Sequence, residues 1–156
     1  MIEKSILIGV LLAVMTFTAA GCGNPRQVPE SQMETKADMT VNLTMHNRTF
    51  RVVLEDNETA RAFRNLLPLE LNMDDVNGNE KYTVLSETIQ NDSPKNPGTI
   101  YAGDLMCYGN AGLVMFYETF ASSYSYVKIG HIDDVNGYLS ALESGSVQVS
   151  IAEADD

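Results

Sequence analysis

Apolar residues at every second position are the feature that most restricts how this chain can fold. Residues 41–45 read Val-Asn-Leu-Thr-Met, 50–54 read Phe-Arg-Val-Val-Leu, and 147–151 read Val-Gln-Val-Ser-Ile. Successive side chains of a strand point to opposite faces, so this period predicts strands with one buried face. The polar segment 46–49 between the first two runs predicts a hairpin. The chain is therefore predicted to be mainly β.

The middle of the chain is predicted to contain both loops and short strands. Residues 73–97 are rich in Asn, Asp, Gly and Pro, a composition typical of turns. We expect long loops there, with one or two small strands around 81–85. Three further strands are predicted at 104–108, 113–117 and 124–129.

Two short helices are predicted between the strands. The first follows Asp56 or Asn57 as its N-cap and ends at Pro68, because apolar residues between them recur at helical spacing. The second covers 135–142 and follows two aspartates that can cap it. Seven or eight short strands with two helices favour a closed barrel with helical plugs over an open sheet, because closure leaves no exposed edge.

The N-terminal segment has the features of a bacterial lipoprotein signal. An apolar run over 5–20 leads into Ala-Ala-Gly-Cys, and it is shorter than the roughly 20 residues of a membrane span. We expect residues 1–21 to be removed and Cys22 to carry lipid. An ordinary secreted protein or an uncleaved anchor is the alternative. Residues 22–38 are then a flexible tether, and 39–156 form one folded domain.

The net charge and the cysteine content limit which partners the protein can bind and bear on the compartment in which it works. The net charge of −11 repels nucleic acids and anionic lipid headgroups, so we expect no nucleic-acid partner. The lipid on Cys22 is then the expected membrane contact, with the domain outside the cytoplasm. If Cys22 is acylated, Cys107 has no disulfide partner.

Several motifs resemble those of bacterial cyclophilin-like proteins. They are LEDN at 54–57, LLPLELNM at 66–73, NGNEKY at 77–82, NPGTIYAGDL at 96–105, YG at 108–109, LVMFY at 113–117 and SYSYVKIGHIDD at 123–134. The resemblance extends over about 40–151. It implies a closed eight-stranded cyclophilin-like β-barrel with a short capping helix at each open end, the architecture of peptidyl-prolyl isomerases.

The resemblance supports the fold better than the isomerase activity. Cyclophilin isomerases use an arginine that hydrogen-bonds to the proline nitrogen and favours the twisted amide. Their Phe-His-Arg and Gln-Phe-Phe stretches have no counterpart here. Arg48 and Arg51 are the candidate replacements for the arginine.

Aromatic residues form the candidate binding surface. In the strand predicted at 124–129, Val127 and Ile129 have the core phase, which places Tyr124 and Tyr126 on the outer face. Tyrosine offers apolar area with a polar tip, which suits ligand contacts. Packing against the barrel is the alternative role. The other ligand-binding candidates are Tyr101, Met106, Tyr108, Phe116 and His131.

The remaining chemistry-bearing residues have simpler explanations. DDVNG at 74–78 and 133–137 suits turns, and its glycines lie at the wrong offset for a calcium loop. His46 and His131 show no catalytic spacing to a nucleophile. Cys107 lies in the inward phase of its strand, so we predict a buried apolar side chain rather than a reactive thiol. We expect neither a metal nor another cofactor.

These observations lead to one leading interpretation and two alternatives. The leading interpretation is a lipid-anchored, extracytoplasmic module that binds a peptide segment or a small ligand without efficient catalysis. The first alternative is a peptidyl-prolyl isomerase that acts on exported proteins. The second, which rests on the association of related domains with flavodoxin-like ones, is an accessory domain of an extracytoplasmic redox system.

Overall fold

The computed structural model describes residues 39–91 and 93–154, which all belong to one compact unit. The predicted signal segment, Cys22 and the tether lie outside the described residues. None of the helices in the described ranges is long and apolar enough to cross a membrane.

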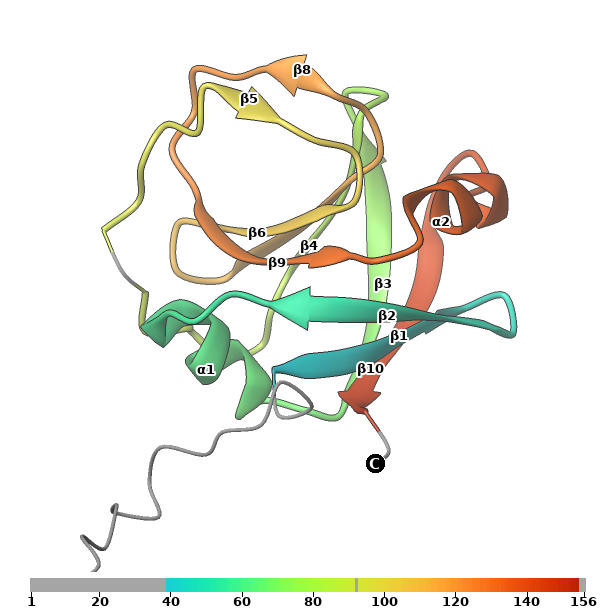
Figure 1. Cartoon of the computed structure of the whole chain (residues 1–156), viewed down its shortest axis with the longest axis horizontal. Coiled ribbons are helices and arrows are strands. Elements are labelled where there is room, and N and C mark those ends of the chain that lie inside the picture. Colours follow the sequence, from blue (N-terminus) through green and yellow to red (C-terminus); the bar gives the residue numbers. More distant parts are fainter. Residues whose placement is uncertain (1–38, 92, 155–156) are drawn as a thin grey trace, which may run out of the picture. The chain divides into compact units, whose positions relative to one another are not determined.

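Eight strands of the described chain close into one antiparallel barrel (Figure 1). They are β1 (Thr40–Met45), β2 (Arg48–Leu54), β3 (Leu69–Val76), β4 (Glu80–Val84), β6 (Asp104–Tyr108), β7 (Gly112–Phe116), β9 (Val127–Ile132) and β10 (Val147–Glu153). Their order around the barrel is β1-β10-β3-β4-β7-β6-β9-β2. Two shorter strands, β5 (Thr99–Ile100) and β8 (Phe120–Ala121), pair with each other in a separate sheet. The predicted closed barrel is confirmed.

The first and last strands of the barrel lie side by side and close it. Leu43 of β1 is opposite Phe50 of β2 on one side and Ile151 of β10 on the other. The turn between β1 and β2 places His46 and Asn47 at positive φ angles of 48° and 62°. Both residue types tolerate this left-handed region better than most, so the polar turn forms the predicted hairpin.

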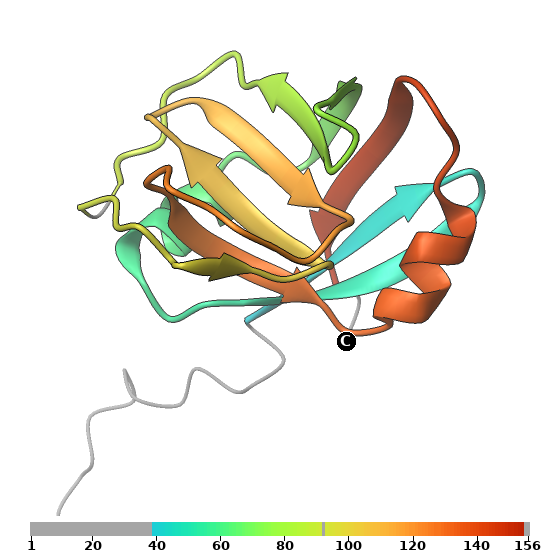
Figure 2. The same cartoon turned by 90° about the horizontal axis from the view of Figure 1, so that it is seen from above.

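Each of the two helices contributes one aromatic residue to the barrel core. Phe63 of α1 (Glu58–Arg64) and Tyr138 of α2 (Val135–Ala141) are completely buried. The helices lie on opposite sides of the barrel in both views (Figures 1 and 2). The side chain of Asn57 caps α1 by accepting from the Ala60 amide at 2.8 Å. The side chain of Asp134 caps α2 in the same way.

Two segments differ from the prediction. Residues 73–76, which we predicted to lie in a loop region, belong to the long strand β3 (Leu69–Val76). Its first half does alternate, with Leu69, Leu71 and Met73 on the core side, but the following Asp-Asp hides the pattern. Strand β9 begins at Val127, three residues later than predicted, because Tyr126 instead pairs with Lys95 in an isolated bridge.

Candidate functional site

A second apolar cluster lies on the outside of the barrel, separate from the core. Its origin is the alternation along β7, where Leu113 and Met115 pack inward while Val114 and Phe116 pack outward. The β5–β8 pair contributes Ile100 and Phe120. The whole outer cluster consists of Ile100, Met106, Val114, Phe116 and Tyr126, with Tyr82 and Phe120 packed against it.

Beside this cluster lies a cavity of about 360 Å³, here called the tyrosine pocket. The Tyr126 ring packs 5.6 Å from Phe116 and 5.5 Å from Tyr108, and Tyr108 in turn lies 6.3 Å from Tyr124, measured between ring centroids. Tyr126 is only 9% exposed, whereas Tyr108 and Tyr124 are 44% and 62% exposed. The lining residues are Val76, Asn77, Asn79, Glu80, Tyr82, Tyr108, Val114, Phe120, Tyr124 and Tyr126.

A second cavity, of about 600 Å³, shares Tyr126 with the first and is called here the Lys95 pocket. Some of the polar side chains in its lining already bond to other residues of the protein. Asp104, which is buried, accepts from Lys128 Nζ at 2.8 Å and from the Tyr101 amide at 3.0 Å. The lining residues are Asn57, Ser93, Lys95, Pro97, Thr99, Tyr101, Asp104, Met106, Tyr126, Val127 and Lys128.

The aromatic candidates gather at these two cavities. Tyr108 and Tyr124 line the tyrosine pocket, Tyr101 and Met106 line the Lys95 pocket, and Tyr126 lines both. Tyr126 therefore borders both cavities and is largely buried, which agrees with the packing alternative for this residue.

Two other candidates lie away from the cavity surfaces. Phe116 is fully buried behind Tyr126 and supports its ring. His131 lies within β9, opposite Val53 of β2 and Asp104 of β6, and it lines neither pocket.

The two candidate arginines of β2 are engaged elsewhere. Arg48 Nη1 donates to Ser140 Oγ at 3.0 Å, and its guanidinium lies 5.2 Å from the centre of the Phe50 ring. Arg51 Nη2 donates to Thr40 Oγ1 at 3.5 Å. Neither side chain lines the tyrosine pocket or the Lys95 pocket.

Sequence reasoning missed the polar side of the tyrosine pocket. Asn79 and Glu80 line it at the turn between β3 and β4. Burial raises the pKa of the Glu80 carboxyl. The pKa of Tyr126 is raised first by burial and then by the charge of Glu80. The NGNEKY motif contains both residues, but the motif alone does not show which distant segments pack beside them to form the pocket.

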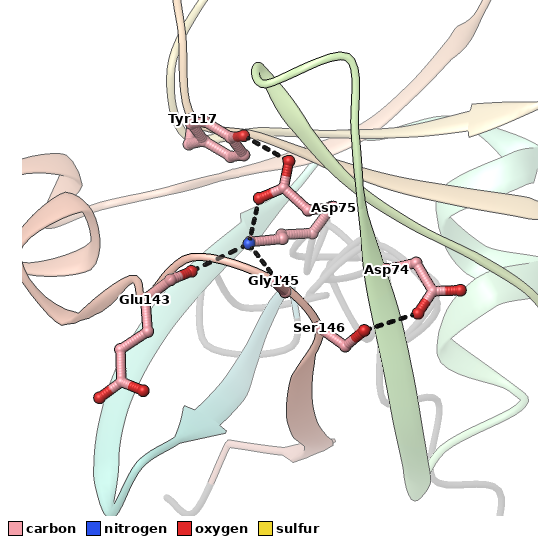
Figure 3. Close-up of polar contacts among 7 residues, drawn as sticks. Asp74, Asp75, Tyr117, Glu143, Gly145 and Ser146 are labelled. Carbon is pink, nitrogen blue, oxygen red and sulfur yellow. Dashed lines mark hydrogen bonds and ion pairs between the residues drawn. The ribbon is translucent and has the colours of Figure 1, made fainter.

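A buried lysine of β4 bonds to Asp75 of β3 and to the loop between α2 and β10 (Figure 3). Lys81 is 1% exposed, and its Nζ donates to Asp75 Oδ2 at 2.6 Å and to the carbonyl oxygens of Glu143 and Gly145 at 3.0 and 2.6 Å. Tyr117 also donates to Asp75, at 2.9 Å. All three N–H donors of the ammonium are in use, which indicates a structural role.

The ionisable groups around this lysine affect one another. Hydrogen bonds from Lys81 and Tyr117 lower the pKa of Asp75. Burial, followed by the bond to Asp75, raises the pKa of Tyr117 to about 12. Both groups are therefore in their ordinary charge states at neutral pH, the carboxyl ionised and the phenol neutral.

Two further features of the described chain concern thiol and metal chemistry. Cys107 is fully buried in the barrel core, as predicted, and burial raises the pKa of its thiol. No group of three or more His, Cys, Asp or Glu residues in the described ranges is placed to hold a metal ion.

Comparisons with known proteins agree with this architecture. The profile described as "Cyclophilin-like family" matches residues 43–152. A solved structure, the solution structure of the hypothetical protein AF2241 from Archaeoglobus fulgidus, is 17% identical with a TM-score of 0.58, and the alignment covers 79% of this chain and 100% of that one. At this identity the likeness supports the fold alone. No curated protein matches the chain.

Proposed function

This chain belongs to the cyclophilin-like family, and from that membership we propose that it is a binding module without efficient catalysis. It holds a peptide segment or a small ligand in the aromatic cavities on the outside of the barrel. A lipid on Cys22 anchors the module to the membrane, on the side away from the cytoplasm.

The observation that carries the proposal is the tyrosine pocket. Its volume of about 360 Å³ falls within the range of roughly 300–1,000 Å³ that is typical of small-ligand sites. Aromatic residues make up half of its lining, and Tyr108 and Tyr124 remain substantially exposed although their rings pack against each other. Partly exposed tyrosines provide apolar contact area with a polar tip, which favours ligand binding.

The arginines of the described residues favour binding over catalysis. The isomerase mechanism needs an arginine aimed at the proline nitrogen in an apolar groove. No arginine of the described chain lines either pocket. Each one instead bonds to a residue outside both pockets, in the pairs Arg48–Ser140, Arg51–Thr40, Arg61–Asp56 and Arg64–Glu153.

Tyr124→Ala is expected to weaken ligand binding by 5- to 30-fold with little loss of stability. Such truncation of an aromatic contact typically costs about 1–2 kcal/mol of binding free energy, and Tyr124 is 62% exposed, so the fold depends little on it. NMR titration with blocked pentapeptides that differ in their central residue measures the change in affinity. Tyr126→Ala is a poorer probe, because Tyr126 also packs between Phe116 and Tyr108.

Tyr101→Ala provides the matched control, since Tyr101 is 59% exposed and lines only the Lys95 pocket. Weaker binding in this variant alone would move the site to that pocket, and no effect in either variant would refute the proposal. Proline-containing peptides should also be followed by exchange spectroscopy. Isomerisation that drops about 10²-fold in Arg48→Ala or Arg51→Ala would establish the isomerase alternative.

Cys22→Ser is expected to abolish lipid attachment and to leave an uncleaved precursor, because thioether acylation requires a thiol at this position. Metabolic labelling with palmitate, followed by membrane fractionation, measures both effects. Cys107→Ser is the control and should be labelled like the wild type. A wild-type protein that is never labelled would refute the proposed anchor.

A further inference from the structure

The tyrosine pocket carries a negative charge that no described basic residue neutralises. Glu80 is half-buried in its lining. The lining contains no lysine, arginine or histidine, and the ion pairs of the described residues do not include Glu80. A partly buried carboxylate without a counter-charge favours a cationic partner.

An unpaired acceptor belongs to Asn79, the residue before Glu80 in the chain. The Oδ1 atom of Asn79 is buried and accepts no hydrogen bond from the described residues. Asn79 also lines the pocket. Buried acceptors are normally paired, so a ligand N–H donor in the pocket would satisfy this oxygen once the Asn79 amide turns toward it.

The aromatic lining favours the same kind of ligand. Tyrosine and phenylalanine rings attract cations to their faces, and the pocket contains Phe120 and four tyrosines, Tyr82, Tyr108, Tyr124 and Tyr126. The net charge of −11 also raises the local concentration of cations around the protein.

We propose that the tyrosine pocket recognises a protonated primary amine, with Glu80 as counter-charge, Asn79 as hydrogen-bond acceptor and the aromatic rings around the ammonium group. This inference rests on the proposed function, because it names the ligand class of the same pocket. An anion would be repelled by Glu80. A neutral apolar group would leave Glu80 and Asn79 without partners, and a quaternary ammonium has no N–H for Asn79.

Three blocked pentapeptides that differ only at the central residue test the proposal, with lysine, Nε-acetyl-lysine or norleucine at that position. We expect the lysine peptide to bind at least about tenfold more tightly than the other two, because both neutral analogues lose the charge. Equal binding of all three would overturn the inference while leaving the binding module intact. If neither these three peptides, nor any other pentapeptide, nor n-pentylamine binds, both the amine recognition and the binding module are refuted.

Two variants locate the recognition in the pocket. Glu80→Gln keeps the shape of the side chain and is expected to remove most of the preference for lysine over norleucine, with norleucine binding unchanged. Asn79→Leu is expected to weaken lysine binding about three- to tenfold without lowering the melting temperature, because it removes an acceptor that has no partner in the free protein. A lysine preference that survives Glu80→Gln would overturn the assignment.

A small amine tests whether the pocket binds a free amine or a lysine side chain within a peptide. n-Pentylamine carries the ammonium group and the chain of a lysine side chain without a peptide backbone. Binding of n-pentylamine as tight as that of the lysine peptide, and lost in Glu80→Gln, identifies a free amine as sufficient. Much weaker binding identifies a peptide ligand, and either result supports amine recognition. If tetramethylammonium binds more tightly than both, the proposed role of the Asn79 acceptor is wrong.

Discussion

A chain that ends after Gly145 is expected to lose its cooperative fold. This truncation removes β10, which pairs with β1 on one side and β3 on the other. Val147, Val149 and Ile151 are at most 2% exposed, and each such side chain contributes about 1.5–3 kcal/mol through burial. Their sum, with the lost ladder bonds, is comparable to the roughly 5–15 kcal/mol that stabilises a whole domain.

Thermal unfolding followed by circular dichroism measures this effect, and the truncated protein should show either no sigmoidal transition or aggregation through its open edges. A chain that ends after Glu153 keeps β10 complete and serves as the control, which should melt like the wild type. Cooperative melting of the shorter chain near the wild-type temperature would mean that the barrel does not depend on closure by β10.

Lys81→Met is expected to destabilise the protein by about 3 kcal/mol. The substitution keeps most of the side-chain volume but removes one bond to a carboxylate and two bonds to carbonyl oxygens, and charge-assisted bonds of this kind are among the strongest in proteins. Urea unfolding measures the change in the free energy of unfolding. Lys95→Met, which removes the same charge from an exposed position, is the control and should change stability by less than about 0.5 kcal/mol.

The dependence of the free energy of unfolding on acid pH tests whether Lys81→Met destabilises the protein by removing the bond to Asp75. Because Lys81 lowers the pKa of Asp75, the ionised carboxylate adds stability above its unfolded-state pKa, and this contribution is lost as the pH falls through the lowered pKa. The Lys81→Met protein lacks the largest cause of the shift and should therefore lose less stability over that acid range. An unchanged acid profile would indicate that only packing was lost.

Local patterns were sufficient to predict much of the barrel. The alternation in β1, β2 and β10 predicted both the strands and their buried faces, because the direction of a side chain along a strand follows directly from its position. The helix caps Asn57 and Asp134 were also among the residues predicted, since an N-cap needs only a short polar side chain beside the first helical turn. In the same way, the phase of its strand placed Cys107 in the core.

The candidate site depended on the tertiary structure. Asn79 and Glu80 lie far along the chain from Tyr124, and the closed strand order places all three at one cavity. The same order places Arg48 and Arg51 on β2, away from both pockets.

What the sequence determined by itself was the period of each strand, the chemistry of the caps and turns, and the net charge, because these depend on neighbouring residues or on composition. Only the tertiary structure decided that Lys81 is inside the barrel with its charge satisfied and that Glu80, the residue before it, faces a cavity without a counter-charge. The physical reason is that adjacent residues of a strand face opposite sides, and only the strands packed around them decide what each side chain meets.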